Sequence, residues 1–239
     1  MARLSKEQTA FLKEATSRYH ESLPGTAADE YLREDRNLGA SDRMWAKVQK
    51  FRLGYVEDPL PGHEQYQGML AIPYLRRSEA RDEFGRRQWS TVSIRFRCLV
   101  PGCQHEFHGK YNSVEGDRPT LFNTVALLKP TDKMLICEGE LDALTAQVHG
   151  FDAVGVPGVQ LWKKSFTELL LGYETVFIAA DGDDPGRDFA KKVRAFLPNG
   201  RIVRCPPGQD INSWITNQEG YNEFRELVGN PSGRKELVK

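Results

Sequence analysis

The sequence has few cysteines, no long apolar run and no net charge, and the first two of these absences exclude classes of protein. Its four cysteines, at positions 98, 103, 137 and 205, do not form the paired framework of a secreted, disulfide-rich domain. No run approaches the length of a membrane span, and the first residues lack the apolar core of a signal peptide. We therefore expect a cytoplasmic protein with no membrane partner.

The balanced charge hides an uneven distribution. Residues 1–130 hold 20 Lys and Arg against 17 Asp and Glu, whereas residues 131–239 hold 13 against 16. The segment from Arg76 to Arg97 has seven arginines and three acids. A basic segment beside an acidic one suits a polyanion held by arginine while a metal works on its phosphates. A solvated, charged hairpin explains the same charges equally well.

Two distant stretches, residues 134–144 and 176–186, share one pattern. Each begins with a short apolar run, continues into acidic residues and glycine, and ends in a helical pattern. The apolar runs are typical of strands buried on both faces of a parallel sheet. Chemistry in such sheets collects at the carboxyl ends of the strands, which here carry Glu138, Asp181 and Asp183, with Asp142 one helical turn beyond Glu138.

These carboxylates need an explanation because unpaired negative charges that lie together are costly unless a cation or a proton neutralises them. Hard divalent ions such as Mg²⁺ prefer oxygen ligands, so a metal site is one explanation. The other is ordinary turn and helix-cap chemistry of Asp-Gly and Glu-Gly. For either stretch alone we favour the caps, and for both together we favour the metal.

The hydrophobic pattern predicts an α/β protein whose parallel sheet with flanking helices is preceded by a smaller α+β subdomain. The expected boundaries are residues 1–130, 131–229 and a flexible tail, 230–239. The first part should contain helices 6–22 and 27–38 and strands, with a polar excursion from Arg76 to Arg87. The second part should alternate strands 134–137, 153–156, 175–180 and 201–204 with helices 140–149, 161–171 and 185–196 and helical turns over 211–228.

The acidic pair resembles the Toprim signature, a glutamate after one strand and an Asp-x-Asp after a later one. Here these residues are Glu138, then Asp181 and Asp183. The similarity extends over roughly residues 130–216, including a third acidic loop, 206–214, that contains Asp210. Toprim domains occur in primases, topoisomerases, small nucleases and recombination mediators.

Upstream segments resemble the catalytic core of bacterial (DnaG-type) primases. The matching stretches are Tyr31–Leu38, Phe51–Tyr55 and Lys110–Ser113, the last with one residue fewer than the family's pattern. We expect a catalytic core without a separate N-terminal zinc ribbon or a helicase domain, which would fit a phage-encoded primase. A topoisomerase would need a nucleophilic tyrosine in a further domain.

This resemblance implies metal-dependent synthesis of short RNA primers on a single-stranded DNA template from ribonucleoside triphosphates, with a replicative helicase as a further partner. It implies catalytic roles for Glu138, Asp181 and Asp183, and Mg²⁺ or Mn²⁺ held by these three with Asp210 and Asp142. The nucleic-acid- or nucleotide-binding residues that it implies are Arg36, Arg95, Arg97, Lys110 and Asn112. Two alternatives stay open, a Toprim-type nuclease and a non-catalytic nucleic-acid-binding replication accessory protein.

A second constellation, Cys98, Cys103, His105 and His108, has two interpretations. Two thiols and two imidazoles can supply the four ligands of a tetrahedral Zn²⁺, although their spacing is not a standard zinc-finger pattern. The alternative is a β-turn at Pro101-Gly102 with reduced cysteines.

Overall fold

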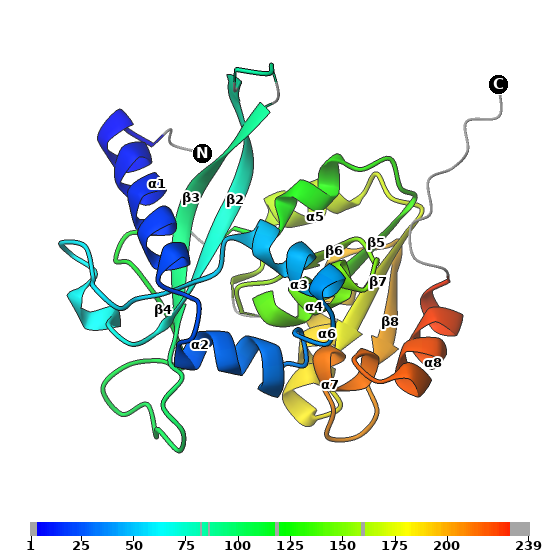
Figure 1. Cartoon of the computed structure of the whole chain (residues 1–239). Helices are drawn as coiled ribbons and strands as arrows, with labels where there is room; N and C mark the ends of the chain where they lie inside the picture. The colour runs from blue at the N-terminus through cyan, green and yellow to red at the C-terminus, as the bar shows by residue number, and fades with distance from the viewer. Residues whose placement is uncertain (1–3, 82, 86, 118–119, 159–160, 230–239) are drawn as a thin grey trace. The chain divides into compact units, whose positions relative to one another are not determined.

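The computed structural model describes residues 4–81, 83–85, 87–117, 120–158 and 161–229. The chain divides into two compact units, residues 1–118 and 119–239 (Figure 1). The first is α+β and the second is α/β with a parallel sheet, so the predicted fold class is confirmed. In the described part of the chain, no helix is both long enough and apolar enough to cross a bilayer.

The first unit contains an antiparallel sheet with helices before it. The strands follow the order β1-β2-β3-β4. Helix α1 starts with a capping box, in which Ser5 and Gln8 each satisfy the other's backbone N–H. The elements are α1 (Lys6–Glu21), α2 (Ala27–Glu30), a π-helical turn (Tyr31–Asp35), α3 (Asp42–Val48), β1 (Gly54–Tyr55), β2 (Leu70–Arg81), β3 (Arg87–Arg97) and β4 (Tyr111–Ser113).

A cluster of aromatic rings fills the core of this unit. Tyr66 and Phe96 stack with 3.9 Å between ring centroids, and the Tyr19 hydroxyl lies 2.9 Å from His63 Nδ1. Burial lowers the pKa of His63, which keeps the ring neutral inside the core. Because side chains alternate along a strand, the burial of Phe96 places its neighbours on β3 on the opposite face of the sheet.

The segment predicted as a polar excursion, Arg76–Arg87, is mostly strand, and that prediction was wrong. Strand β2 continues to Arg81 and β3 begins at Arg87, with Arg76 paired to Ser90 and Arg77 to Trp89. The pairing of β2 with β3 extends past the core. Both faces of this outer part of the hairpin therefore meet solvent, and its sequence shows no alternation of apolar and polar residues. Backbone hydrogen bonds form the ladder without that signal.

Three predicted helices differ from those of the structure. The helix expected over 27–38 is α-helical only to Glu30 and continues as the π-helical turn. The helix expected over 161–171 covers only Lys164–Leu170. The helical turns over 211–228 form two helices, because the Asn217 side chain caps a new helix start.

The second unit is a four-stranded parallel sheet in the order β6-β5-β7-β8. Its strands are β5 (Lys133–Cys137), β6 (Ala153–Gly155), β7 (Thr175–Ala180) and β8 (Gly200–Arg204). Its helices are α4 (Glu140–Val148), α5 (Lys164–Leu170), α6 (Asp184–Phe196), α7 (Ile211–Ile215) and α8 (Gln218–Val228).

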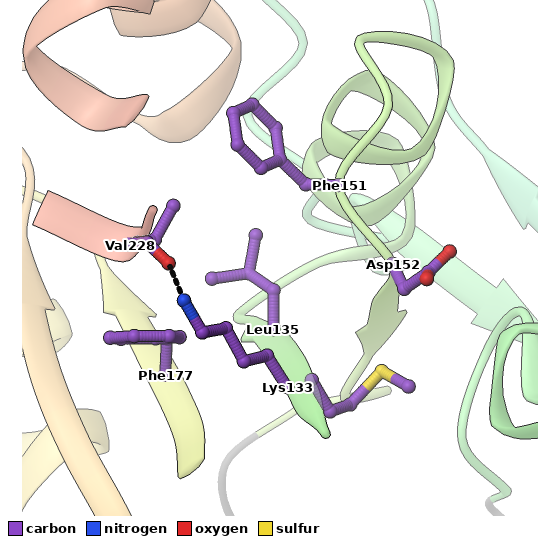
Figure 2. A pocket seen from close by; sticks show the side chains of 7 residues that line it. Lys133, Leu135, Phe151, Asp152, Phe177 and Val228 are labelled. Carbon is purple, nitrogen blue, oxygen red and sulfur yellow. Dashed lines mark hydrogen bonds between the residues drawn. The ribbon is translucent and has the colours of Figure 1, made fainter. Parts of the chain in front are cut away.

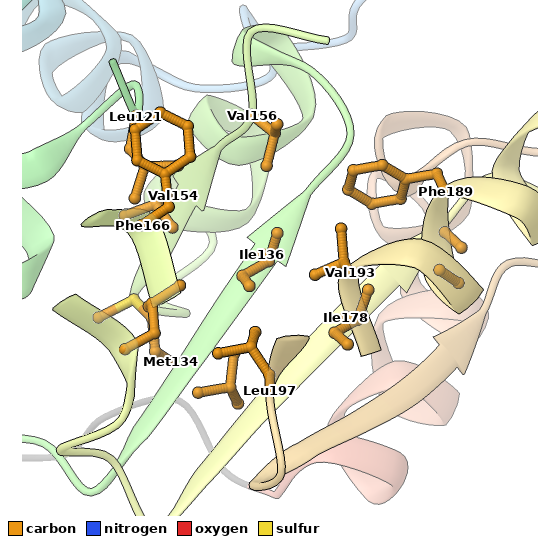
Figure 3. Close-up of a cluster of buried hydrophobic side chains, with 14 of the residues drawn as sticks. Leu121, Met134, Ile136, Val154, Val156, Phe166, Ile178, Phe189, Val193 and Leu197 are labelled. Atoms are coloured by element: carbon orange, nitrogen blue, oxygen red, sulfur yellow. The ribbon is translucent and has the colours of Figure 1, made fainter. Parts of the chain in front are cut away.

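Alternate residues of the central strands point to opposite helical layers. Ile136 and Ile178 pack against side chains of α5 and α6, among them Phe166 and Phe189 (Figure 3). Helix α7 packs against both α4 and α8, and a hydrogen bond of 3.0 Å joins Asn212 Nδ2 to Thr145 Oγ1. Every residue of β7 is buried, as the apolar run in the sequence predicts.

The second unit begins before the predicted boundary at residue 130. Leu121 and Ala126 belong to its hydrophobic core, and Phe122 exchanges two backbone hydrogen bonds with Gly155, of 2.8 and 3.2 Å. These contacts tie the short 3₁₀ helix Thr124–Leu128 to the parallel sheet. Assignment of this segment to the second unit therefore follows from its packing.

A small cavity of about 30 Å³ lies at the amino ends of the strands in the second unit. Figure 2 shows its lining, in which the Lys133 ammonium donates to the Val228 carbonyl over 3.3 Å. The cavity has room for little more than a water molecule. It lies at the edge where β5 begins, so it is separate from the carboxyl edge where the acidic residues stand.

The packing of α6 gives a test of the second unit's core. We expect Phe189→Ala to reduce the free energy of unfolding by about 3–5 kcal/mol, because Phe189 is fully buried against the sheet. Phe196→Ala, on the same helix but 53% exposed, should cost much less. Urea unfolding followed by circular dichroism measures both, and equal losses would contradict the described packing.

Candidate metal centre and nucleic-acid-binding face

The strand order creates a natural site at the carboxyl edge of the parallel sheet. The chain passes from β5 to β6 on one side, then returns to β7 and β8 on the other. Connections therefore leave the carboxyl ends of β5 and β7 in opposite directions, and ligands of open α/β sheets bind at such switch points. Glu138 directly follows β5, and Asp181 directly follows β7.

The remaining predicted ligands stand on helix starts around this point. Asp142 lies in the first turn of α4. Asp183 caps α6 by accepting the Gly186 N–H over 2.8 Å, and Asp210 caps α7 by accepting from the Ser213 N–H over 2.7 Å. Asp183 and Asp210 thus cap helices, whereas Glu138 does not, because α4 begins after Gly139 without a side-chain cap. Each of these caps uses the Oδ1 atom of its carboxylate.

Close backbone contacts bring the third acidic loop to the second. The Gly182 N–H donates to the Gln209 carbonyl over 2.8 Å, and the Gly208 N–H donates to the Gly182 carbonyl over 3.3 Å. A Cβ atom at position 182 would lie only 1.9 Å from the Pro206 carbonyl oxygen, so only glycine fits there. This contact places Asp210 near Asp181.

Burial and neighbouring carboxylates raise the pKa of Asp181 and of Glu138. Burial, then Asp142, Glu138, Asp210 and Asp183 in that order, raise the pKa of Asp181 to about 8. Burial, with Asp183 and Asp142, raises the pKa of Glu138 to about 7. The charged groups that raise the pKa of Asp181 are all carboxylates, so negative charge is concentrated at this centre. The structure thus brings the five predicted acids into one interacting group.

The donors of this acidic group fit a hard divalent cation. Glu138 Oε2 is buried and has no hydrogen-bond partner among the described residues. A buried acceptor without a donor is unfavourable, and a bound cation would satisfy it. Carboxylate oxygens are the ligands that Mg²⁺ and Mn²⁺ prefer.

Two buried thiols lie beneath this group. Cys137 ends β5 and Cys205 follows β8. Burial and the nearby aspartates raise the pKa of both thiols, so they remain protonated and pack as small apolar groups. Cys137 is fully buried in the core of the second unit.

In the first unit, Arg95 and Arg97 share one face of β3 with Tyr111 of β4. The Arg97 guanidinium donates to the Tyr111 hydroxyl and lies 4.9 Å from the centroid of that ring and 5.1 Å from that of Tyr31. The Arg95 guanidinium lies 5.2 Å from the Tyr111 ring. Cation–π contacts of this kind hold guanidinium groups in place without neutralising their charge.

The other predicted nucleic-acid-binding residues occupy different places. Asn112 pairs with Phe96, which puts it on the opposite face from Arg95 and Arg97, and its amide bonds to the Gly109 backbone. Lys110 is exposed beside β4. Arg36 is half-buried at the end of the π-helical turn, and its backbone N–H donates to the Tyr31 carbonyl over 2.9 Å.

Two tyrosines that lie against Arg97 were not among the predicted site residues, namely Tyr31 and Tyr111. Both stand in the stretches that carry the family resemblance, but nothing in their spacing says that one arginine lies near both rings. Tyr31 lies on the π-helical turn, far from β3 in the sequence. An aromatic residue in each matched stretch was the available signal.

Comparisons with known proteins agree with the fold described above. Residues 135–215 match the Toprim-like domain family. The chain is 50% identical over 153 residues to the Gene 57 protein of Mycobacterium phage D29, which covers 64% of this chain and 93% of that protein.

Solved structures resemble both units. The RNA polymerase domain of Mycobacterium tuberculosis primase DnaG, in complex with double-stranded DNA, matches with a TM-score of 0.70 and 18% identity, over 94% of this chain and 80% of that chain. A DnaG primase catalytic domain bound to single-stranded DNA matches with a TM-score of 0.66 and 17% identity, over 92% of this chain and 77% of that chain. At such identities the likeness shows the fold.

The raised pKa values predict a pH-dependent stability in metal-free protein. Glu138 and Asp181 keep their protons up to about pH 7 and 8 when folded, whereas the unfolded chain releases them near pH 4. The folded state therefore binds more protons in between, and its stability falls as the pH rises. In EDTA, we expect the melting temperature to drop from about pH 5 to 8.

Asp181→Asn should make this drop smaller, because it removes one of the two titrating groups. Asp188→Asn, an exposed position on α6, serves as the control and should keep the wild-type dependence. Identical pH profiles for wild type and Asp181→Asn would show that these carboxylates do not interact as described.

Proposed function

Because the chain belongs to the family of the Gene 57 protein of Mycobacterium phage D29 and combines a Toprim-like domain with the DnaG catalytic-core fold, we propose that it is a DNA primase catalytic core. It makes short RNA primers on a single-stranded DNA template from ribonucleoside triphosphates. The observation that carries this proposal is the extent of the structural likeness, 92–94% of the chain, which includes the first unit as well as the Toprim-like domain.

The proposed active site is the acidic group at the carboxyl edge of the parallel sheet. Asp181, Asp183 and Asp210, with Asp142, hold Mg²⁺ or Mn²⁺ there. A divalent cation at this site would supply charge stabilisation for phosphoryl transfer and orient the phosphates. Glu138, with a pKa of about 7, can either bind the cation or accept a proton from the attacking hydroxyl, since its pKa lies near neutral pH.

We propose that the face of β3 that carries Arg95 and Arg97, called the arginine face below, binds nucleic acid or nucleotide phosphates. The two related structures contain double-stranded and single-stranded DNA, which supports such a role. Arg95 and Arg97 are oriented by tyrosines, so little rotamer freedom is lost when a phosphate binds. Lys110 and Arg36 add positive charge, whereas Asn112 acts through the Gly109 backbone in this proposal.

A Toprim-type nuclease would use the same acids, so the reaction itself has to be tested. Labelled ribonucleotides on an unlabelled single-stranded template give short labelled RNA if the protein is a primase. Cleavage of the template without such RNA would support the nuclease, and binding without either reaction would support an accessory protein. A replicative helicase as partner and a phage genome as source remain predictions, the latter supported by the phage relative.

The acids provide a sharp mutational test of the proposal. We expect Asp181→Asn and Asp183→Asn each to reduce primer synthesis at least about 100-fold, because each removes a negative ligand from the metal site. Asn caps helices as well as Asp does, so Asp183→Asn should keep the start of α6 intact.

Asp184→Asn is the matched control, because Asp184 is exposed, adjacent, and ion-paired with Arg187 outside the acidic group. It should retain activity. Primer yield is read on a denaturing gel, with circular dichroism to establish folding. Full activity of folded Asp181→Asn protein would eliminate the proposed metal ligand.

Salt dependence tests the arginine face. If Arg95 and Arg97 each contact one phosphate of single-stranded DNA, replacing both with Gln should reduce the slope of log K against log salt by about 1.4, or 0.7 for each contact. Lys6→Gln with Lys13→Gln removes the same charge from the exposed side of α1 and should leave the slope nearly unchanged. Fluorescence anisotropy measures both, and equal slopes in the two double variants would place the template elsewhere.

A further inference from the structure

The loop between β3 and β4 brings four metal-ligating side chains together. One potential ligand atom from each of Cys98, Cys103, His105 and His108 lies within 4.8 Å of the other three. Cys103 Sγ and His108 Nε2 are 3.7 Å apart. Ligands at 2.0–2.3 Å from a tetrahedral zinc lie about 3.3–3.8 Å from one another, so a small closure of this group would form such a shell.

The protonation pattern suits metal binding. His108 Nδ1 lies 3.0 Å from the Gly109 carbonyl, an arrangement in which Nδ1–H donates and leaves the Nε2 lone pair directed to Cys103. His105 Nδ1 is buried and has no hydrogen-bond partner among the described residues. Both cysteines are free thiols in spite of their proximity. A buried nitrogen without a partner needs an explanation, which a metal ion provides.

The rest of the loop offers no apolar core that would order it. Val100 and Phe107 are 64% and 95% exposed, whereas all four candidate ligands are buried or half-buried. His105 also adopts a left-handed backbone conformation, with φ of 56°, which non-glycine residues rarely adopt without compensation. The inward side of this loop is thus formed largely by ligand atoms.

The β-turn of the alternative interpretation is present as well. The Cys103 N–H donates to the Val100 carbonyl over 3.3 Å, and Gly102 has a φ of 68°, as a Pro-Gly turn requires. This turn reverses the chain between the two cysteines and so brings their sulfurs to the same side. The turn and the metal site are therefore compatible.

We propose that Cys98, Cys103, His105 and His108 bind one Zn²⁺ in a closed, structural site. Two thiolates and two imidazoles match the donor preference of zinc, and the hard, oxygen-binding ions of the acidic group would not compete for them. With four protein ligands, no coordination position is left for substrate, so the ion stabilises the loop and takes no part in the reaction.

Bound zinc would also position β4. His108 Nδ1 and Asn112 Nδ2 both bond to the carbonyl of Gly109, at 3.0 and 2.7 Å. Asn112 follows Tyr111, the first residue of β4, and the Tyr111 hydroxyl accepts a hydrogen bond from Arg97. The Cys98 N–H closes the base of the loop by donating to the Lys110 carbonyl over 3.0 Å. Fixing the loop therefore fixes the tyrosine that orients the arginine.

The test is elemental analysis of full-length protein purified without chelator in zinc-supplemented medium. We expect about one Zn²⁺ per chain, and under about 0.2 in the Cys98→Ser/Cys103→Ser double variant. Cys205→Ala is the matched control, a buried cysteine outside the loop whose zinc content should equal that of wild type. Zinc retained in full by the double variant, or absent from wild type, would overturn the proposal.

Two measurements on wild-type protein keep the test decisive if the double variant does not fold. Co²⁺ substituted for the zinc should give the intense visible absorption of a tetrahedral thiolate site. Removal of zinc with a strong chelator should increase proteolysis within residues 98–110, and re-addition of Zn²⁺, but not Mg²⁺, should reverse it. Unchanged proteolysis after the zinc has left would contradict a structural role. None of these readouts depends on primase activity.

Discussion

The mutual repulsion of carboxylates at one sheet edge is the constraint around which the second unit is organised. Burial and four neighbouring acids raise the pKa of Asp181 to about 8, and similar causes raise that of Glu138 to about 7. Such an arrangement is unfavourable in isolation and becomes favourable when a divalent cation binds. The strand order places these two acids at the switch point of the sheet, helix caps place Asp183 and Asp210 around it, and Asp142 lies in the first turn of α4.

Backbone contacts bring the acidic loops close together. Gly182 permits the third acidic loop to approach within hydrogen-bond distance, where any side chain would collide with the Pro206 carbonyl. Gly186 similarly lets the first turn of α6 contact the Asp181 backbone, since a Cβ atom there would lie 2.4 Å from its carbonyl oxygen. A frame of this kind restricts the movement of the loops that carry the acids, as the proposed cation site would require.

The sequence predicts most of the parallel sheet and the members of the acidic group. Its buried strands leave continuous apolar runs, and its acids follow these runs directly. The outer parts of β2 and β3 were missed because their residues, such as Arg76 and Arg77, meet solvent on both faces and show no alternation of apolar and polar side chains. Tyr31 and Tyr111 were missed because their contacts with Arg97 depend on tertiary packing. The Cys/His group was predicted only as an alternative, since its spacing alone does not show convergence.

The central claim, that the acidic group binds a divalent cation, is tested most directly by calorimetric titration of metal-free protein with Mn²⁺ near pH 7.5. Repeating the titration in buffers of different ionisation enthalpy gives the number of protons released. Asp181 and the protonated fraction of Glu138 must lose their protons to a metal, so the account predicts saturable binding with net proton release, and less release from Asp181→Asn. No saturable binding, or identical proton release from wild type and Asp181→Asn, would contradict it.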